Sequence, residues 1–435
     1  MTLKTIEFLD LDGPTTALTA EDDLWLADLA KVAQPDAFVV PFAHRHPDEH
    51  PGSVLERSGR GWRAGRYIGQ LRRGDRILKI SPRLGIDTIG RWMAAVTGVV
   101  AVKQTAGLGE SPDLLVAPMI ARLWANSVAQ SSQHGLPTFR REVDASGTTV
   151  KGRLNGRLTA GFSARGVASV AWTERQKSLD NSVSRSIVAA DNVLGGLLDS
   201  WAPGWRGPRV EEIVMRLRHS TGNRPRLPDR RQLDQMRYTP IRLPFKETAE
   251  LSWRIAHFGG IQNTPAGDDI EGMLIDVAEL WELFVLACAR EAFPTESVVH
   301  GNLGGDKSYL LRSTRDGTSG LGRLLPDITV GPASSPVAII DAKYKRLTND
   351  RRDPDRGDLY QLAAYLATNS KAELPPPIGL LAYPATSEMA LEIRSEALGP
   401  WKTSQGNLVS FERLPTEQIQ CSAALRAIVC PLSSG

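Results

Sequence analysis

The chain has 435 residues, of which 41% are hydrophobic and 23% charged, so we expect two or three globular domains with buried cores. Its net charge of +3 is too small to indicate a nucleic-acid partner by itself, and any basic surface must be local. Three cysteines without a CxxC pair, an acid-bearing N-terminus and no apolar run of about 18 residues argue against zinc ribbons, signal peptides and membrane spans, so we expect a cytoplasmic protein.

Residues 1–140 are predicted to form a mixed α+β N-terminal domain. A hairpin is expected where Arg66–Leu71 and Arg76–Ile80 flank a turn at Gly74-Asp75, because such a turn between apolar runs is typical of hairpins. Pro82 would end the second strand. A helical period follows through residues 112–133 and ends before Gly135.

Residues 141–245 are predicted to be a middle, mainly helical region that links the two ends of the chain. One helix is expected at about 178–199, and another begins near Pro208. Arginines crowd the stretch that follows, at Arg216, Arg218, Arg224, Arg226, Arg230, Arg231 and Arg237. This stretch has two interpretations, a solvated loop broken by prolines or a strip that contacts phosphates.

Residues 246–435 are predicted to form one α/β domain. The expected elements follow the order helix, three strands, helix, strand. Their residues are 270–293, 309–312, 324–330, 337–343, 355–369 and 378–383.

Two acids and a lysine at the ends of neighbouring strands carry the chemistry that we predict. Asp341 and Lys343 are two residues apart on one strand and therefore project to the same face. If the preceding strand pairs with it as a hairpin, Asp327 comes close to Asp341, and the two carboxylates suit Mg²⁺, with Mn²⁺ as an alternative. Such an ion polarises a phosphate and activates a water, while Lys343 positions that water or stabilises the developing charge.

Three further residues favour an active site over the simpler interpretation, a surface salt bridge at a strand end. Gln361 and Tyr365 are one helical turn apart on one face of the predicted helix. Glu282 lies between apolar residues of the first helix and could bind the metal or orient a water. Acids next to apolar strands and helices are costly unless they have a partner or a function.

This pattern resembles the PD-(D/E)xK nuclease superfamily, whose restriction-endonuclease-like core has the same order of elements. The resemblance implies that Asp327 and Asp341 bind the metal, that Lys343 assists catalysis and that Glu282 is an additional acid. The Gln361–Tyr365 pattern resembles the subgroup that includes RecB-type nucleases.

Other segments resemble the McrC family, the nuclease subunit of McrBC methylcytosine-dependent restriction systems. They are Gly65–Gln70, Leu78–Gly85, Val150–Leu154, Asp180-Asn181, Met273–Val285 and Asp341–Lys345. The resemblance implies cleavage of modified, foreign double-stranded DNA in phage defence. It also implies a AAA+ GTPase hexamer as partner, which the N-terminal region would contact and stimulate.

The sequence also departs from this family pattern. The middle region, especially 200–270, is longer than expected, and Ala342 stands where a threonine is more usual between the acid and the lysine. Two alternative functions stay open: a stand-alone or repair nuclease without a GTPase, and a non-catalytic adaptor that binds DNA or a partner. Intact acids and lysine argue against the adaptor.

Three other motifs in the sequence have less specific patterns. Gly301–Ser308 lacks the glycine before lysine that a P-loop needs and precedes a strand, so we interpret it as a turn and expect no nucleotide motor in this chain. His44, His46 and His50 are expected in a solvated loop, with a metal site as the alternative interpretation. The loop after the catalytic strand is either a simple surface loop or a clamp on the DNA backbone, through Lys345, Arg346, Arg351 and Arg352.

Overall fold

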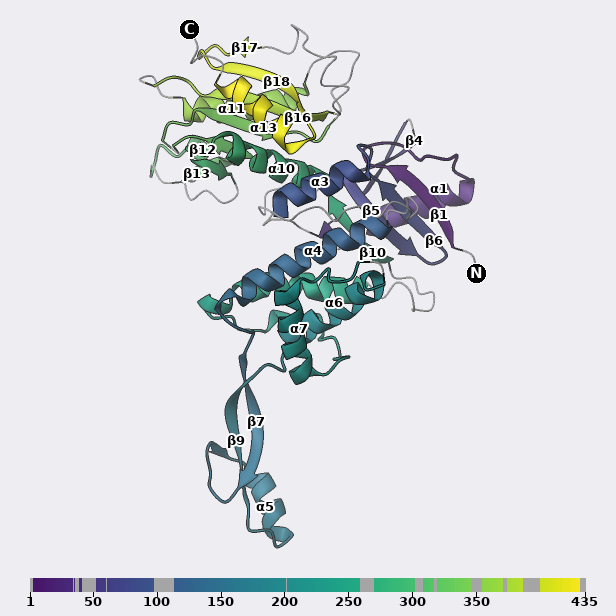
Figure 1. Cartoon of the computed structure of the whole chain (residues 1–435), viewed down its shortest axis with the longest axis vertical. Helices are drawn as coiled ribbons and strands as arrows, with labels where there is room; N and C mark the ends of the chain where they lie inside the picture. The colour runs from purple at the N-terminus through teal and green to yellow at the C-terminus, as the bar shows by residue number, and fades with distance from the viewer. Residues whose placement is uncertain are drawn as a thin grey trace. The chain divides into compact units, whose positions relative to one another are not determined.

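Figure 1 shows the chain in a computed structural model, which describes residues 3–33, 35, 39–40, 52–59, 61–97, 113–200, 202–258, 270–301, 308–316, 319–332, 334–345, 354–370, 374–385 and 400–430. The chain packs as two compact units, Met1–Val116 with Ala266–Gly435, and Ala117–Pro265. The predicted domains 1–140, 141–245 and 246–435 differ from these units, because both ends of the chain share one unit; as domains they stay a prediction. No helix among the described residues has the length and apolar character needed to cross a membrane.

A five-stranded sheet in the first unit has the order β1-β6-β5-β10-β2. Its strands are β1 (Lys4–Leu9), β2 (Val39–Val40), β5 (Tyr67–Arg73), β6 (Arg76–Ser81) and β10 (Ile270–Asp276). The predicted hairpin is confirmed, since β5 and β6 pair antiparallel with Arg73 opposite Arg76. Strands β3 (Leu55–Ser58) and β4 (Gly61–Ala64) form a separate ribbon, and α1 (Ala20–Val32) and α3 (Ile86–Thr97) complete this region.

The prediction of a helix at 270–293 is wrong for its first seven residues, because these form the strand β10. The helix α10 covers only Val277–Ala292, and Asp276 caps it by accepting hydrogen bonds from the backbone N–H groups of Ala278 and Glu279. Within β10, a Cβ on Gly272 would lie 2.1 Å from the carbonyl oxygen of Gln70 in β5. A glycine therefore allows this close strand pairing.

The second unit is mainly helical. Its helices are α4 (Asp113–Ser131, which begins just before the unit), η1 (Ser132–His134), α5 (Gly156–Ala164), α6 (Ser182–Leu198), α7 (Pro208–Thr221), α8 (Arg230–Asp234), η2 (Pro240–Arg242) and α9 (Pro244–Phe258). The predicted helices at 112–133, 178–199 and 208 are confirmed within a few residues. A three-stranded sheet in this unit consists of β7 (Phe139–Gly147), β8 (Arg153–Leu154) and β9 (Val170–Ser178), and β9 pairs with both of the others.

Part of the arginine-rich stretch is engaged in ion pairs within this unit. Arg218 binds the buried carboxylate of Asp191, and Arg230 contacts Glu250 at 3.2 Å. These contacts favour a structural role for both arginines over phosphate binding.

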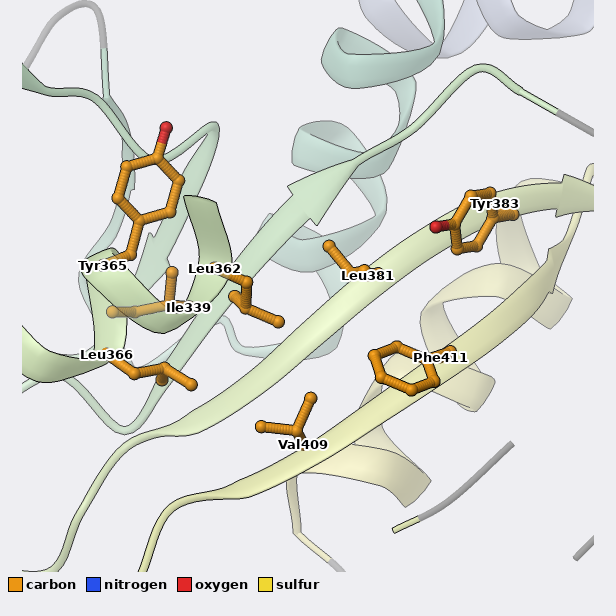
Figure 2. Packing of buried hydrophobic residues seen from close by; sticks show 8 residues of the cluster. All are labelled: Ile339, Leu362, Tyr365, Leu366, Leu381, Tyr383, Val409 and Phe411. Atoms are coloured by element: carbon orange, nitrogen blue, oxygen red, sulfur yellow. The ribbon is translucent and has the colours of Figure 1, made fainter. Parts of the chain in front are cut away.

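A six-stranded sheet in the first unit has the order β11-β14-β15-β16-β18-β17. Its strands are β11 (Val298–His300), β14 (Ile328–Val330), β15 (Ala338–Ala342), β16 (Ile378–Ala385), β17 (Trp401–Lys402) and β18 (Leu408–Pro415). Helices α10, α11 (Arg356–Asn369) and α13 (Gln418–Val429) contact strands of this sheet. Figure 2 shows how one core forms between α11 and the sheet, from Ile339, Leu362, Tyr365, Leu366, Leu381, Tyr383, Val409 and Phe411.

The first strand of this sheet differs from the prediction. Residues 309–312 belong to β12 (Ser308–Arg312), which pairs with β13 (Gly320–Leu324) in a two-stranded ribbon outside the main sheet. The edge position is occupied by β11, which the sequence did not predict. The predicted strand 324–330 is also divided, because Leu325-Pro326-Asp327 separates β13 from β14.

Candidate active site

Asp327 and Asp341 are brought together by the pairing of β14 with β15. The two strands are antiparallel, with Ile328 opposite Ile340, so the residues just beyond this pair, Asp327 and Asp341, lie side by side. The Asp327 carboxylate is held in place because its Oδ2 accepts a hydrogen bond of 2.7 Å from the backbone N–H of Ala342. The predicted proximity of the two acids is therefore confirmed, while their catalytic role stays a prediction.

The environment of these acids is unfavourable for negative charge. Asp341 is fully buried, and its Oδ1 has no hydrogen-bond partner. The pKa of Asp327 is raised well above its ordinary value of 3.8 by burial, by Glu282 and by Asp341, although Lys343 acts in the opposite direction. Carboxylates placed so close together without enough compensating charge are typical of sites that receive a cation.

Lys343 projects to the same side as Asp341, as predicted from the strand period. Its Nζ lies 2.9 Å from Asp341 Oδ2, and its side chain is only 15% exposed. Burial alone would lower the pKa of Lys343, but the carboxylates of Asp341 and Asp327 outweigh it and raise the pKa above 10.5. Lys343 is therefore charged and suited to bind an anion.

Gln361 and Tyr365 of α11 support the lysine through a chain of hydrogen bonds. Lys343 Nζ donates to Gln361 Oε1 at 2.9 Å, and Gln361 Nε2 donates to the Tyr365 hydroxyl at 2.7 Å. The Tyr365 hydroxyl donates to the carbonyl oxygen of Leu325 at 2.9 Å, two residues before Asp327. The two helical residues thus connect Lys343 with the segment that carries the first acid.

Glu282 of α10 also influences the site, because its charge is one of the causes that raise the pKa of Asp327. Its Oε1 lies 2.5 Å from Nε2 of His300 in β11, and the His300 side chain is only 3% exposed. Sequence reasoning missed His300, because β11 itself was not predicted and no motif links the two residues. The burial of a histidine against an acid indicates that His300 fixes the position of Glu282.

Asp358 is a second residue that the sequence analysis missed. It lies in the first turn of α11, is 5% exposed, and its carboxylate is 3.0 Å from Lys345 Nζ and 3.7 Å from Lys343 Nζ. Acids are common in the first turn of a helix because they interact favourably with its dipole, so the sequence did not identify Asp358 as a site residue. Its position between the two lysines makes it part of the site's charge network.

Lys345 was predicted to contact DNA, and in the structure it is half-exposed and bound to Asp358. Arg346, Arg351 and Arg352 lie outside the described residues, as do His44, His46 and His50 and most of Gly301–Ser308. The DNA clamp, the interpretation of the histidine cluster and the turn expected at Gly301–Ser308 therefore all stay predictions.

The donor set fits a divalent cation of the Mg²⁺ type. Within the described ranges, no group of three or more His, Cys, Asp or Glu side chains is already arranged around a single point that could hold a metal. Mg²⁺ does not need such a cage, because it is usually bound by one or two carboxylates together with waters and substrate phosphates. The unpartnered Asp341 Oδ1 next to Asp327 supplies this kind of site.

One family model matches most of the chain. A sequence profile described as "McrBC 5-methylcytosine restriction system component" matches residues 62–384, which include all six residues predicted to be catalytic. A chain in a half-complex from a tetradecameric assembly of Thermococcus gammatolerans McrB AAA+ hexamers with bound McrC is 15% identical, with a TM-score of 0.52, over 98% of this chain and 100% of that chain. At this identity the similarity concerns the mixed α/β fold alone.

A second structure is less similar. A chain of the Thermococcus gammatolerans McrBC complex is 16% identical, with a TM-score of 0.38, over 67% of this chain and 88% of that chain. This TM-score is too low to support an argument about the fold. No curated protein matches the sequence.

Proposed function

The chain belongs to the family of McrBC 5-methylcytosine restriction system components, and on this premise we propose that it is the metal-dependent DNA endonuclease subunit of such a system. The observation that carries the proposal is the fully buried Asp341, which lies beside Asp327 and within 2.9 Å of the Lys343 ammonium. Two acids and a lysine around one point are the groups that metal-assisted phosphodiester hydrolysis requires.

The order of elements supports a PD-(D/E)xK core. Leaving aside the β12–β13 ribbon, the chain runs through α10, β11, β14, β15, α11 and β16, which is the order helix, three strands, helix, strand. The acids lie at the ends of two adjacent strands and the glutamine–tyrosine pair on the following helix, as the superfamily resemblance implies. We therefore assign residues of this core, from Glu282 to Tyr365, to the nuclease site.

Each side chain has a defined part in the proposed reaction. A bound Mg²⁺ or Mn²⁺ would polarise the scissile phosphate and lower the pKa of a water. Asp327 and Asp341 would hold it, with Glu282 as a further ligand or as the residue that orients a water. Lys343, kept charged by the acids and fixed by Gln361, places its ammonium where negative charge develops on the phosphate.

Double-stranded DNA is the proposed substrate, and the family description favours DNA that carries 5-methylcytosine. We also propose a AAA+ GTPase as partner, as in the Thermococcus assembly of McrB hexamers with bound McrC. The N-terminal region would contact this motor, and both proteins would act against foreign DNA in the cytoplasm. A stand-alone nuclease would need no such partner.

The proposal is tested by incubating methylated and unmethylated plasmid with Mg²⁺, first with the chain alone and then with a AAA+ GTPase of the McrB type and GTP. We expect cleavage by the wild type and none by Asp341→Asn. The matched control is Asp75→Asn, an exposed acid in the β5–β6 turn, which should cut like the wild type. Cleavage that survives Asp341→Asn refutes the site assignment, and full activity without the GTPase favours the stand-alone nuclease.

A further inference from the structure

Strands β12 and β13 form a two-stranded ribbon that is separate from the six-stranded sheet. Its strands pair from Ser308 opposite Leu324 to Arg312 opposite Gly320. The ring of Tyr309 lies against Gly320, where an added Cβ would come within 2.2 Å of it. The Tyr309 ring therefore packs across the ribbon against the backbone of β13, and a side chain at position 320 would displace it.

Large apolar side chains are exposed on this ribbon. Leu310 is 52% exposed, Leu311 61% and Leu321 72%. Leu311 and Leu321 are directly opposed across the two strands and therefore share one face. Leu310, the neighbour of Leu311 in β12, points to the opposite face, so the exposed apolar face of the ribbon consists of Leu311 and Leu321.

The same ribbon carries two exposed arginines. Arg312 and Arg315 are exposed, and neither takes part in an ion pair within the described ranges. The acid in the connecting turn, Asp316, is occupied by hydrogen bonds from the backbone N–H and the hydroxyl of Ser319. The ribbon thus combines apolar side chains with free guanidinium groups, a combination that suits a nucleic acid.

The base of the ribbon is anchored at the candidate active site. Leu324, the last residue of β13, packs against the core cluster under α11, and the next residue, Leu325, accepts the hydrogen bond of Tyr365. Asp327 follows two residues later. A duplex whose phosphate reaches Asp327 and Asp341 therefore has to pass close to the ribbon.

We propose that the β12–β13 ribbon is a DNA-contacting element that enters a groove of the duplex beside the cut site. Leu311 and Leu321 would contact base edges, and Arg312 and Arg315 would contact the flanking phosphates. A two-stranded ribbon fits the major groove, which is about 12 Å wide. Continuity with the nuclease site and the unpaired arginines favour DNA over a protein as the occupant. The inference rests on the proposed nuclease function.

The test is fluorescence anisotropy of a labelled methylated duplex, with Ca²⁺ in place of Mg²⁺ to prevent cleavage, for the chain alone and together with its GTPase. Leu311→Ser with Leu321→Ser should weaken binding roughly tenfold, as expected when two apolar contacts are lost. Arg312→Ala with Arg315→Ala should weaken binding and reduce the slope of log affinity against log salt by about 2, because each phosphate contact contributes roughly 0.9. Leu243→Ser, 55% exposed in the second unit, is the matched control and should bind like the wild type.

The outcomes separate this inference from the proposed function. If the wild type cuts and binds DNA but the ribbon variants bind equally well, the inference alone is wrong. If the leucine variant keeps its DNA affinity and instead loses assembly with the GTPase or with a second copy, the ribbon is a protein-docking surface and the inference is also wrong. If the wild type binds no duplex, either alone or together with the GTPase, the proposed nuclease function itself is wrong.

Discussion

The guanidinium group of Arg83 lies 4.6 Å from the centroid of the Tyr344 ring. Arg83 follows strand β6 of the N-terminal sheet, and Tyr344 follows Lys343 of the candidate active site. The backbone N–H of Arg83 donates to Asp10 Oδ1 at 2.5 Å, and Trp92 of α3 is 6.2 Å from the Tyr344 ring. These contacts of Arg83 and Trp92 therefore support the segment directly after β15, which contains Lys343 and Tyr344.

We expect Arg83→Leu to destabilise the first unit by about 3–5 kcal/mol, because it leaves the fully buried Asp10 without its neighbouring cation. The free energy of unfolding, measured with denaturant, checks this. The control is Arg57→Leu, which removes a similar contact over Trp62, but from a half-exposed side chain, and should cost less than about 1 kcal/mol. A cost below about 1 kcal/mol for Arg83→Leu as well would show that the Arg83 contact does not support the fold.

Tyr365→Phe should reduce cleavage roughly 10- to 100-fold, since it removes the hydroxyl that holds Gln361 and, through it, Lys343. The loss of stability should be only about 1 kcal/mol, the usual contribution of one hydrogen bond. Single-turnover rates and thermal denaturation measure the two effects. Tyr360→Phe, 71% exposed on the same helix, should change neither, and an unchanged rate in Tyr365→Phe would remove this tyrosine from the site.

His300→Ala should raise the Mg²⁺ concentration needed for half-maximal cleavage, because Glu282 loses the partner that fixes it. Residues that orient metal ligands typically change metal affinity or activity 10- to 100-fold, and we expect roughly that range. Metal titrations of the cleavage rate provide the measurement, with His219→Ala, exposed at the end of α7, as control. A metal dependence identical to that of the wild type would leave His300 with a purely structural role.

Asp327→Asn should stabilise the metal-free protein at alkaline pH. The pKa of Asp327 is raised above 3.8 in the folded protein, so ionisation of Asp327 lowers the free energy of unfolding. This loss is absent below pH 3.8. It grows as the pH rises above 3.8 and is complete above the raised pKa. The difference in melting temperature between variant and wild type should therefore shrink as the pH falls toward 3.8.

The same variant gives a metal-dependent contrast. Mg²⁺ at about 100 times its Kd should stabilise the wild type by roughly 2.7 kcal/mol, and Asp327→Asn should lose most of this gain. A variant that is less stable than the wild type without metal and equally stabilised by Mg²⁺ would show that Asp327 is a structural acid.

Local patterns in the sequence predicted the features that depend on neighbouring residues. The two-residue period placed Lys343 beside Asp341, and the helical period placed Gln361 within hydrogen-bond distance of Tyr365. The turn at Gly74-Asp75 identified the β5–β6 hairpin for the same reason.

Features that depend on distant pairing were not predictable in this way. Residues 270–276 continue an apolar pattern into α10 but become a strand because β5, far away in sequence, pairs with them. The short β11 has too few residues to show a period, and so His300 was not connected with Glu282. The β12–β13 pairing likewise diverted residues 309–312 from the main sheet.

The proposed nuclease function depends on a divalent cation held by the carboxylates of two adjacent strands. The most direct measurement is anomalous diffraction from crystals of the wild type and of Asp341→Asn soaked in Mn²⁺. We predict an anomalous peak between the Asp327 and Asp341 carboxylates in the wild type and its loss in the variant. A wild-type crystal with manganese elsewhere and none at these two carboxylates would contradict the account.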